Sequence, residues 1–243
     1  MSKEDEIFLA KLNDAKVKAE FNNRMTLFKF LNLHEQQLVE YYAGKDVFVY
    51  FSSGFADGEY KRCIISPFEI EPDFKIAILE VFYDQRYITL GHRNILGALM
   101  SLGIERNVIG DIVLNDGRYY VACMDEMKKY IINEVRNANV RFSLEETKIN
   151  LEGVCDEYQI KLYFLASMRL DVCIAQVYNL SRNDAYEFIT KGLVKVNHKE
   201  CLNPSKLVDV NDIISVRTKG RIKVFSINEN TRSGRIKVEL GRL

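Results

Sequence analysis

The chain has 243 residues and carries 34 Lys and Arg against 34 Asp and Glu, so its formal net charge is zero. Apolar residues make up 47% of it and charged residues 28%, with only 3 Pro and 13 Gly, which excludes collagen-like, mucin-like and wholly disordered chains. The best apolar run, residues 76–83, is too short for a membrane helix, and the acidic N-terminus does not resemble a signal peptide. We therefore expect a cytoplasmic protein without a membrane partner, built from two or three domains.

The first 74 residues predict an N-terminal α+β domain. Apolar periodicity predicts three helices, over residues 3–20, 25–31 and 34–43. β-Branched and aromatic residues predict two strands that pair as a hairpin, over residues 47–51 and 60–66. Pro67 and Pro72 mark the approach to the next domain.

Residues 75–162 predict a second module with the element order β-α-β-β-α-β. Its strands are expected over residues 75–83, 112–115, 118–123 and 140–144, and its helices over residues 94–102 and 125–137. Asp116-Gly117 is a two-residue hairpin signal between the two middle strands. This order is that of the ferredoxin-like fold, which RNA-recognition motifs share.

The aromatic signature of RNA-recognition motifs is largely missing from this module. On the strand that should carry it, only Gly117, Tyr120 and Val121 agree with the motif. Tyr119 or Tyr120 could stack on a base, or either side chain could pack in the protein. We favour the packing role.

Residues 163–243 predict two short helices followed by strands. Leu170, Ile174 and Val177 share one face of a helix that is expected to start at Arg169 and to end at Leu180. Ser181 is a good N-cap for a second helix over residues 182–191. Strands are expected over residues 194–197 and 213–216, and a hairpin with a basic outer face follows them.

The zero net charge conceals a basic C-terminal segment. Residues 163–243 hold 14 basic and 8 acidic residues, whereas residues 1–75 and residues 76–162 each hold 10 basic and 13 acidic residues. A basic module on a neutral chain commonly binds phosphate, although basic residues that merely solvate a surface would produce the same count. Charge alone leaves both interpretations open.

Cysteine and histidine offer little chemistry. The chain has five cysteines, at positions 63, 123, 155, 173 and 201. Their number is odd and no Cys-x-x-Cys pair occurs, which predicts reduced thiols that behave as small apolar residues. His34, His92 and His198 share no metal-ligand spacing. We expect neither a metal site nor a cofactor.

The C-terminal segment closely resembles the S-four RNA-binding domain, named for ribosomal small-subunit protein four. The family pattern is Arg-Leu-Asp, then Ser-Arg-x-x-Ala, then Gly before Val-x-Val-Asn, then Asp before Ile-x-Val. Here the matching segments are residues 169–171, 181–185, 192–197 and 212–216, in the same order. His198 and Asn211 depart from the family's usual Gly, but both stand at turn positions that tolerate positive φ.

The resemblance implies contacts with the phosphates of folded RNA. The helix that starts after Ser181 offers N–H groups and a positive dipole end, and Arg182 adds a bidentate phosphate contact. In the middle module, His92 and Arg93 open a helix and are further candidates, although capping or packing is an alternative role for His92. The candidate RNA-binding residues are Arg169, Ser181, Arg182, Lys191, Lys195, Asn197, Lys199, Arg217, His92 and Arg93.

A second resemblance covers nearly the whole chain. Residues 89–112 contain Gly91-His92-Arg93-Asn94-Ile95-Leu96-Gly97, then Leu102-Gly103-Ile104, then Gly110-Asp111-Ile112. This pattern resembles the signature of the YlmH family of bacterial proteins, and the length and domain order agree. Asn94 replaces the family's usual Asp, which argues against an acid role there.

The YlmH resemblance implies three modules, residues 1–74, 75–162 and 163–243, and a non-enzymatic function. The protein would bind ribosomal RNA and tRNA on the large ribosomal subunit and hold peptidyl-tRNA during ribosome-associated quality control. The motifs of enzymes that carry an S-four domain are missing, so we expect no enzymatic activity and no small-molecule substrate. We also expect a monomer. The alternative is a protein-interaction adaptor linked to cell division, whose binding would depend far less on salt.

Overall fold

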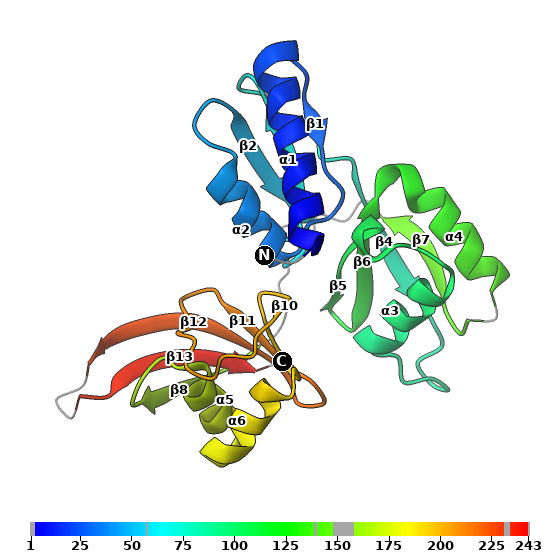
Figure 1. The fold of residues 1–243 in the computed structure, drawn as a ribbon. Helices are drawn as coiled ribbons and strands as arrows, with labels where there is room; N and C mark the ends of the chain where they lie inside the picture. Colours follow the sequence, from blue (N-terminus) through cyan, green and yellow to red (C-terminus); the bar gives the residue numbers. More distant parts are fainter. Residues whose placement is uncertain (1–2, 57, 139, 148–157, 231–233, 243) are drawn as a thin grey trace. The chain divides into compact units, whose positions relative to one another are not determined.

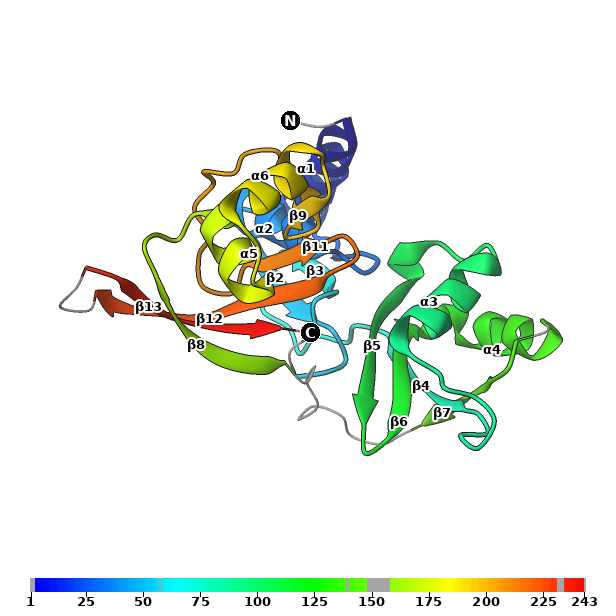
Figure 2. The same ribbon diagram turned by 90° about the horizontal axis from the view of Figure 1, so that it is seen from below.

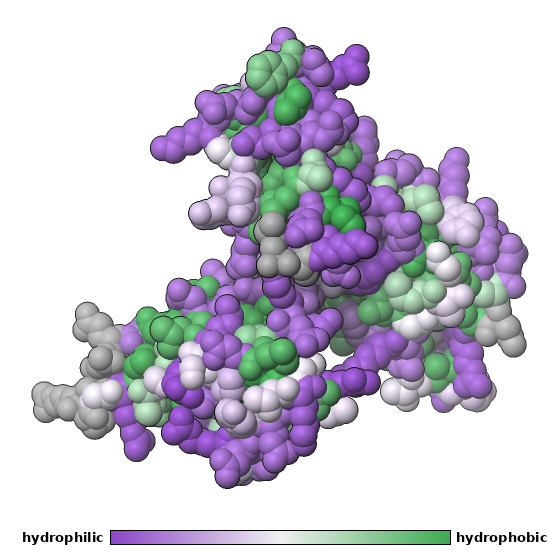
Figure 3. Space-filling model, in the orientation of Figure 1, coloured by the Kyte–Doolittle hydropathy of each residue, from purple (hydrophilic) through white to green (hydrophobic). Residues whose placement is uncertain are grey.

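The structure is a computed structural model, and it describes residues 3–56, 58–138, 140–147, 158–230 and 234–242. Contacts divide the chain into two compact units, Met1–Asp156 and Glu157–Leu243. Each unit combines helices with sheets, so the fold class is α+β (Figure 1). Hydrophilic residues cover much of the surface in view, and hydrophobic residues gather in separate patches between them (Figure 3). Among the helices of the described ranges, none has the length and apolar character that crossing a membrane requires.

The first part of unit 1 is a small sheet with two helices. The helices are α1 (Lys3–Asn22) and α2 (Leu33–Tyr42), and the strands are β1 (Thr26–Leu27), β2 (Phe48–Ser52) and β3 (Arg62–Ser66), in the order β1-β3-β2. Helix α1 buries Phe8, Leu12, Ala15 and Ala19, which recur at helical spacing. A capping box between Asn32 and Glu35 starts α2.

The prediction of a helix over residues 25–31 is wrong. This segment is extended and runs beside β3, with the N–H of Phe28 donating to the carbonyl of Cys63 at 2.8 Å. The N–H of Leu31 donates to the carbonyl of Lys61, also at 2.8 Å. A short apolar run does not distinguish helix from strand by periodicity, and pairing with a neighbouring strand decides the outcome here.

The second part of unit 1 has the elements β4 (Ile76–Phe82), α3 (His92–Ser101), β5 (Ile109–Asn115), β6 (Arg118–Met124), α4 (Lys128–Asn137) and β7 (Ser143–Thr147). They form an antiparallel sheet in the order β5-β6-β4-β7. Ile95 of α3 and Ile131 of α4 are fully buried in its core, and both helices lie over the sheet in Figure 2. Asp116 and Gly117 both have positive φ, 48° and 75°, which confirms the predicted hairpin turn.

The other face of this sheet is covered by the N-terminal part of the same unit. Phe30 and Phe55 are buried in the core cluster of the four-stranded sheet. A Cβ placed on Gly110 would lie 2.7 Å from the Phe30 ring, and one on Gly54 would lie 2.9 Å from Ile76. The backbone therefore approaches closely at both glycines. The boundary predicted between residues 74 and 75 thus falls inside one compact unit, and a three-domain division stays a prediction.

Unit 2 is a six-stranded sheet with two helices. Its helices are α5 (Leu170–Tyr178) and α6 (Arg182–Thr190), and its strands are β8 (Gln159–Leu165), β9 (Val194–Val196), β10 (Lys199–Glu200), β11 (Ile213–Val216), β12 (Gly220–Asn230) and β13 (Ile236–Arg242). The strand order is β10-β9-β11-β12-β13-β8. Ile174 of α5 and Ile189 of α6 pack with Val224 and Val238 of the sheet.

Two expectations for this unit need correction. The boundary between residues 162 and 163 falls inside β8, which pairs with β13 along its whole length and so belongs to unit 2. Helix α5 ends before Leu180, because Asn179 adopts a left-handed conformation with φ 52° and ψ 48°. The predicted β12–β13 hairpin is confirmed, with Val238 and Leu240 buried in the core. Residues 231–233 lie outside the described residues.

Three of the cysteines are thiols of the core. Cys63, Cys123 and Cys173 are buried and free, and burial raises the pKa of each thiol to about 12. Cys201 is free and half-buried, and Cys155 lies outside the described residues. No group of metal-ligating side chains occurs within the described ranges.

Candidate nucleic-acid interface

Two arginines converge on one buried carboxylate where α5 and α6 begin. Arg169 precedes α5 and contacts Asp171 with two hydrogen bonds, Nε to Oδ1 at 3.0 Å and Nη2 to Oδ2 at 2.9 Å. Arg182, the first residue of α6, reaches the same Oδ2 from Nη2 at 3.4 Å. The Asp171 side chain is 6% exposed, whereas those of Arg169 and Arg182 are 36% and 68% exposed. The buried carboxylate thus orients both guanidinium groups, and the exposed parts of these groups face solvent.

The electrostatics of this cluster favour its charged form. Burial acts to raise the pKa of Asp171, but the hydrogen bond from Arg169 and the charges of Arg169 and Arg182 outweigh it and hold that pKa below its usual value. The same hydrogen bond raises the pKa of Arg169. Arg169 therefore keeps its positive charge, and planar guanidinium groups suit the bidentate recognition of phosphate.

Ser181 caps α6 rather than pointing freely into solvent. Its Oγ accepts a hydrogen bond from the N–H of Asp184 at 3.0 Å and donates to Asp184 Oδ2 at 2.7 Å. The N–H groups of Arg182 and Asn183 make no hydrogen bond to other described residues, so they remain available at the positive end of the helix. Ser181 therefore holds the backbone of the first turn of α6, and the predicted N-cap is confirmed.

The remaining candidate cations of unit 2 are exposed but scattered over different elements. Lys191 ends α6 and pairs with Glu187 at 2.6 Å. Lys195 projects from β9 on the side opposite to the buried Val194 and Val196. Lys199 lies on β10, and Arg217 follows β11. Whether these four side chains contact RNA stays a prediction.

Asn197 is part of the fold's internal bonding. It is 7% exposed and adopts φ 50° at the end of β9. Its Nδ2 donates to Asp212 at 2.7 Å, and its Oδ1 accepts from the N–H of Ile213 at 2.9 Å. Both ends of the amide thus join the loop before β11 to the β9 turn, and we assign Asn197 a structural role.

His92 and Arg93 lie in unit 1, at the first turn of α3. Arg93 is exposed and His92 is half-buried. The N–H of Gly91 donates to Asn94 Oδ1 at 3.1 Å, so Asn94 supports the start of this helix. His92 and Arg93 therefore belong to a different unit from the Arg169 cluster. Their contact with RNA stays a prediction.

The sheet of unit 1 does not present the open aromatic face of an RNA-recognition motif. Tyr120 is 3% exposed, and burial raises the pKa of its hydroxyl. Tyr119 is half-buried and packs against the core. Both tyrosines have the packing role that the sequence favoured. Phe30 packs on the face on which Ala122 lies, because a Cβ on Gly110 would lie 2.7 Å from Phe30 and 3.0 Å from Ala122.

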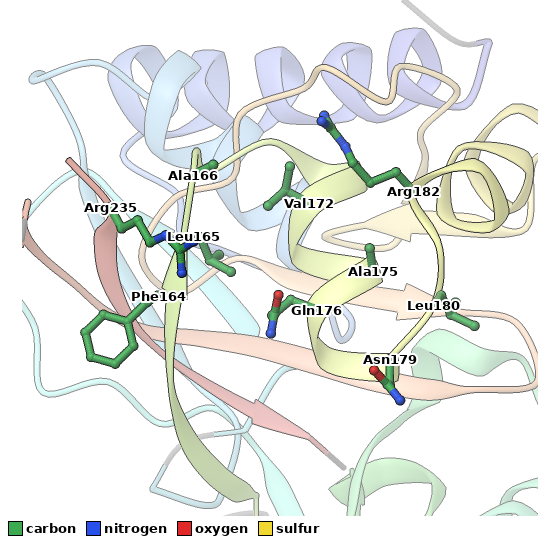
Figure 4. A pocket seen from close by; sticks show the side chains of 10 residues that line it. All are labelled: Phe164, Leu165, Ala166, Val172, Ala175, Gln176, Asn179, Leu180, Arg182 and Arg235. Atoms are coloured by element: carbon green, nitrogen blue, oxygen red, sulfur yellow. The ribbon is translucent and has the colours of Figure 1, made fainter. Parts of the chain in front are cut away.

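A pocket of about 330 Å³ opens between the end of β8 and helix α5 (Figure 4). Its lining combines apolar side chains with two amides and two arginines: Phe164, Leu165, Ala166, Val172, Ala175, Gln176, Asn179, Leu180, Arg182 and Arg235. Gln176 lies between β8 and α5 in this view. Because Arg182 lines the pocket and also contacts Asp171, the pocket continues the surface of the arginine cluster.

Sequence reasoning omitted Asp171 and Asp184 from the candidate residues. Both carboxylates act on the candidate site through a neighbour, Asp171 by orienting two arginines and Asp184 by completing the α6 cap. The signal was present, because Asp171 is part of the Arg-Leu-Asp pattern. A pattern match alone does not show which member of a motif is buried.

Comparisons with known proteins agree with this arrangement. Residues 70–151 match the family model "Putative RNA-binding domain in YlmH", and residues 168–214 match the S4 domain. Neither model describes an enzyme. "Ribosome-associated protein quality control protein P2" of Bacillus subtilis (strain 168) is 31% identical over 227 residues, which cover 90% of this chain and 88% of that protein.

A solved structure, "Cell division protein ylmH from Streptococcus pneumoniae", is 28% identical and covers 60% of this chain and 93% of that chain, with a TM-score of 0.48. The two domain matches occur in the order that the sequence predicts, and the Bacillus relative spans nearly the whole chain. The chain therefore belongs to the YlmH family, as its sequence signature indicated.

Proposed function

We propose that this chain is a non-enzymatic RNA-binding protein of the large ribosomal subunit. The observation that carries the proposal is the Arg169–Asp171–Arg182 cluster at the start of α6, in the basic segment of the chain. It supplies preorganised guanidinium groups and open backbone N–H groups within one surface, which suits phosphate. The name of the Bacillus relative supports the ribosome as the place of action.

The finer assignments are part of the same proposal. The protein binds structured rRNA and tRNA and holds peptidyl-tRNA during ribosome-associated quality control. It acts as a cytoplasmic monomer without a small-molecule substrate. Residues 75–147 form a ferredoxin-like module, supported by the element order and by the strand order β5-β6-β4-β7. Phosphate contacts supply affinity rather than sequence information, so the shape of folded RNA determines the binding site.

Sucrose-gradient sedimentation of cell lysate tests the proposal. The wild-type chain is compared with Arg182→Ala/Lys195→Ala and with Lys18→Ala/Lys29→Ala, which removes two exposed cations of unit 1. Wild type and the unit 1 control should sediment with the large subunit, and the Arg182 variant should remain near the top. The association should also weaken steeply as salt rises, because each phosphate contact releases counterions.

Two results would contradict the proposal. The first is a wild-type chain that stays at the top of the gradient even when stalled subunits accumulate. The second is a wild-type chain that sediments with subunits equally well at low and at high salt. Salt-independent association would favour the protein-interaction adaptor instead.

A further inference from the structure

The C-terminal sheet has a second face, opposite to α5 and α6. Tyr163 and Leu165 of β8 pack toward the helices, so the alternating residues Ile160, Leu162 and Phe164 stand on the other side. These three side chains are 52%, 46% and 47% exposed. We call this side of the sheet the outer face, and it includes Tyr158, Ile160, Leu162, Phe164, Lys195, Arg221, Lys223, Phe225, Lys237 and Gly241.

An aromatic pair lies on the outer face where β8 begins, beside Gly241 of β13. A register shift between Val224 and Ser226 displaces Phe225 from regular pairing. A Cβ on Gly241 would lie 2.5 Å from the Phe225 ring and 2.8 Å from Tyr158, so only glycine lets the ring settle on the strand. The Tyr158 and Phe225 rings meet edge to face with centroids 5.6 Å apart.

Cations lie on the same face as these rings. Lys223 Nζ stands 5.3 Å from the centre of the Phe225 ring. Lys237 is opposite Phe164 in the β13–β8 ladder. Arg221, Ser215 and Lys195 are paired in one row across β12, β11 and β9, so the cations continue to a residue that the sequence identified as an RNA contact.

Carboxylates are fewer on this side of the sheet. Glu239 is engaged by Ser226, whose Oγ donates to it at 2.9 Å. Glu200 lies opposite Lys195 in the β10–β9 ladder. Among the side chains of this face that the structure describes, four cations therefore stand against two carboxylates, which favours a polyanion as the occupant.

The sheets of unit 1 and unit 2 differ in how far other residues of the chain cover the face opposite to the helices. Phe30 and Phe55 of the chain itself cover the corresponding face of the unit 1 sheet, and Tyr120 is buried there. On the unit 2 sheet, within the ranges that the structure describes, the aromatic and aliphatic side chains of β8 remain about half exposed. Of the rings on this face, Phe164 is exposed and Tyr158 and Phe225 are half-buried. Accessible rings flanked by Lys and Arg form the arrangement on which nucleic-acid bases stack.

We propose that the outer face of the unit 2 sheet is a stacking platform for unpaired RNA bases. The proposal rests on the proposed function, because it extends the same RNA interface from folded RNA to an adjoining single strand. Phe225, Tyr158 and Phe164 supply ring faces, and Lys195, Arg221, Lys223 and Lys237 neutralise the phosphates between the bases. Stacking tolerates any base, so the platform should show little sequence preference.

Fluorescence anisotropy of the full chain with two probes tests the platform. One probe is a short labelled oligouridylate, which has no stable secondary structure, and the other is a fully paired RNA hairpin. The variants are Phe225→Leu and Phe164→Leu, which keep apolar bulk but remove the ring, and Phe225→Tyr and Phe164→Tyr, which restore a ring. Leu162→Ala is the matched control, because it removes apolar area from the same face without removing a ring.

Each Leu variant should bind the oligouridylate about fivefold more weakly, at the lower end of the effect of one stacked base. The Tyr variants and Leu162→Ala should stay within about twofold of wild type, and hairpin binding should change little in all five. Equal oligouridylate affinity in the Leu and Tyr variants would overturn the platform. A loss with Leu162→Ala as large as that with Phe225→Leu would also overturn it, since general apolar contact is typical of a protein partner.

The hairpin separates this proposal from the proposed function. If the wild-type chain binds the hairpin and Arg182→Ala weakens that binding, the proposed function stands whatever happens with the oligouridylate. If the wild-type chain binds neither probe, both proposals fail.

Discussion

Replacing Asp171 by Asn tests whether the arginine cluster depends on a charged carboxylate. In the wild type, Asp171 Oδ1 accepts a hydrogen bond from the N–H of Val172 at 2.9 Å, and the side-chain oxygen of Asn retains this acceptor. The substitution removes the charge and one hydrogen bond to Arg169. A hydrogen bond to a charged group contributes ~1.5–3 kcal/mol, and the partial exposure of both arginines reduces this through solvent screening. We therefore expect the free energy of unfolding of unit 2 to fall by about 1–2 kcal/mol at neutral pH.

The pH dependence of this loss identifies its cause. Burial opposes ionisation of Asp171, but Arg169 and Arg182 outweigh burial and hold its pKa below the ordinary value of 3.8. A carboxyl with a lowered folded-state pKa stabilises the fold fully above its ordinary pKa, and that stabilisation is lost as pH falls through the folded-state value. The difference between wild type and Asp171→Asn should therefore be constant above about pH 5 and should shrink below pH 3.8.

Native-state hydrogen exchange of the α5 and α6 amides measures this difference locally, so the unfolding of unit 1 does not enter. Glu187→Gln is the control, because Glu187 pairs with Lys191 on the exposed surface and should contribute little. Equal protection in wild type and Asp171→Asn at pH 7 would refute the reasoning. A difference that persists unchanged at pH 3 would show that the cause is steric rather than electrostatic.

Three further substitutions separate structural residues from contact residues. Ser181→Ala should cost about 1 kcal/mol of unit 2 stability through loss of the α6 cap, measured by the same exchange experiment, and an unchanged opening free energy would contradict the capping role. Asn197→Ala should cost about 1–3 kcal/mol because it leaves a buried N–H unpaired; equal urea midpoints for variant and wild type would refute this. Phe30→Ala should cost about 3–5 kcal/mol in unit 1, and exchange of the β6 amides should rise, whereas unaltered exchange would show that Phe30 does not close that sheet.

The sequence predicted the elements whose signals are local. The helices α1 and α2, the Asp116-Gly117 turn and the Ser181 cap each depend on a few neighbouring residues, and each appears where it was expected. The motif residues Arg169 and Arg182 are 13 positions apart in the chain, yet the motif spacing placed them on one surface. Local chemistry and a family pattern were sufficient for these features.

Features that depend on distant contacts were not predicted. Strand β8 owes its place to pairing with β13, which lies at the other end of unit 2. Residues 25–31 became extended because β3 offered hydrogen-bond partners. Phe30 and Phe55 joined the core of the unit 1 sheet although the sequence assigned them to a separate domain. In each case tertiary pairing overrode a pattern that a short window cannot resolve.

The S-four pattern combines residues with different roles, and the structure separates them. Asn197 binds internal loops, Ser181 caps a helix and Asp171 orients guanidinium groups. Each of these residues is needed to build the surface, so its replacement should lower stability together with RNA affinity. Arg182 is the most exposed member of its cluster, so Arg182→Ala should lower RNA affinity with little change in stability. If Ser181→Ala lowers both stability and RNA affinity, and Arg182→Ala lowers RNA affinity alone, then the arginine makes the phosphate contact. The rest of the pattern would then hold that arginine in place.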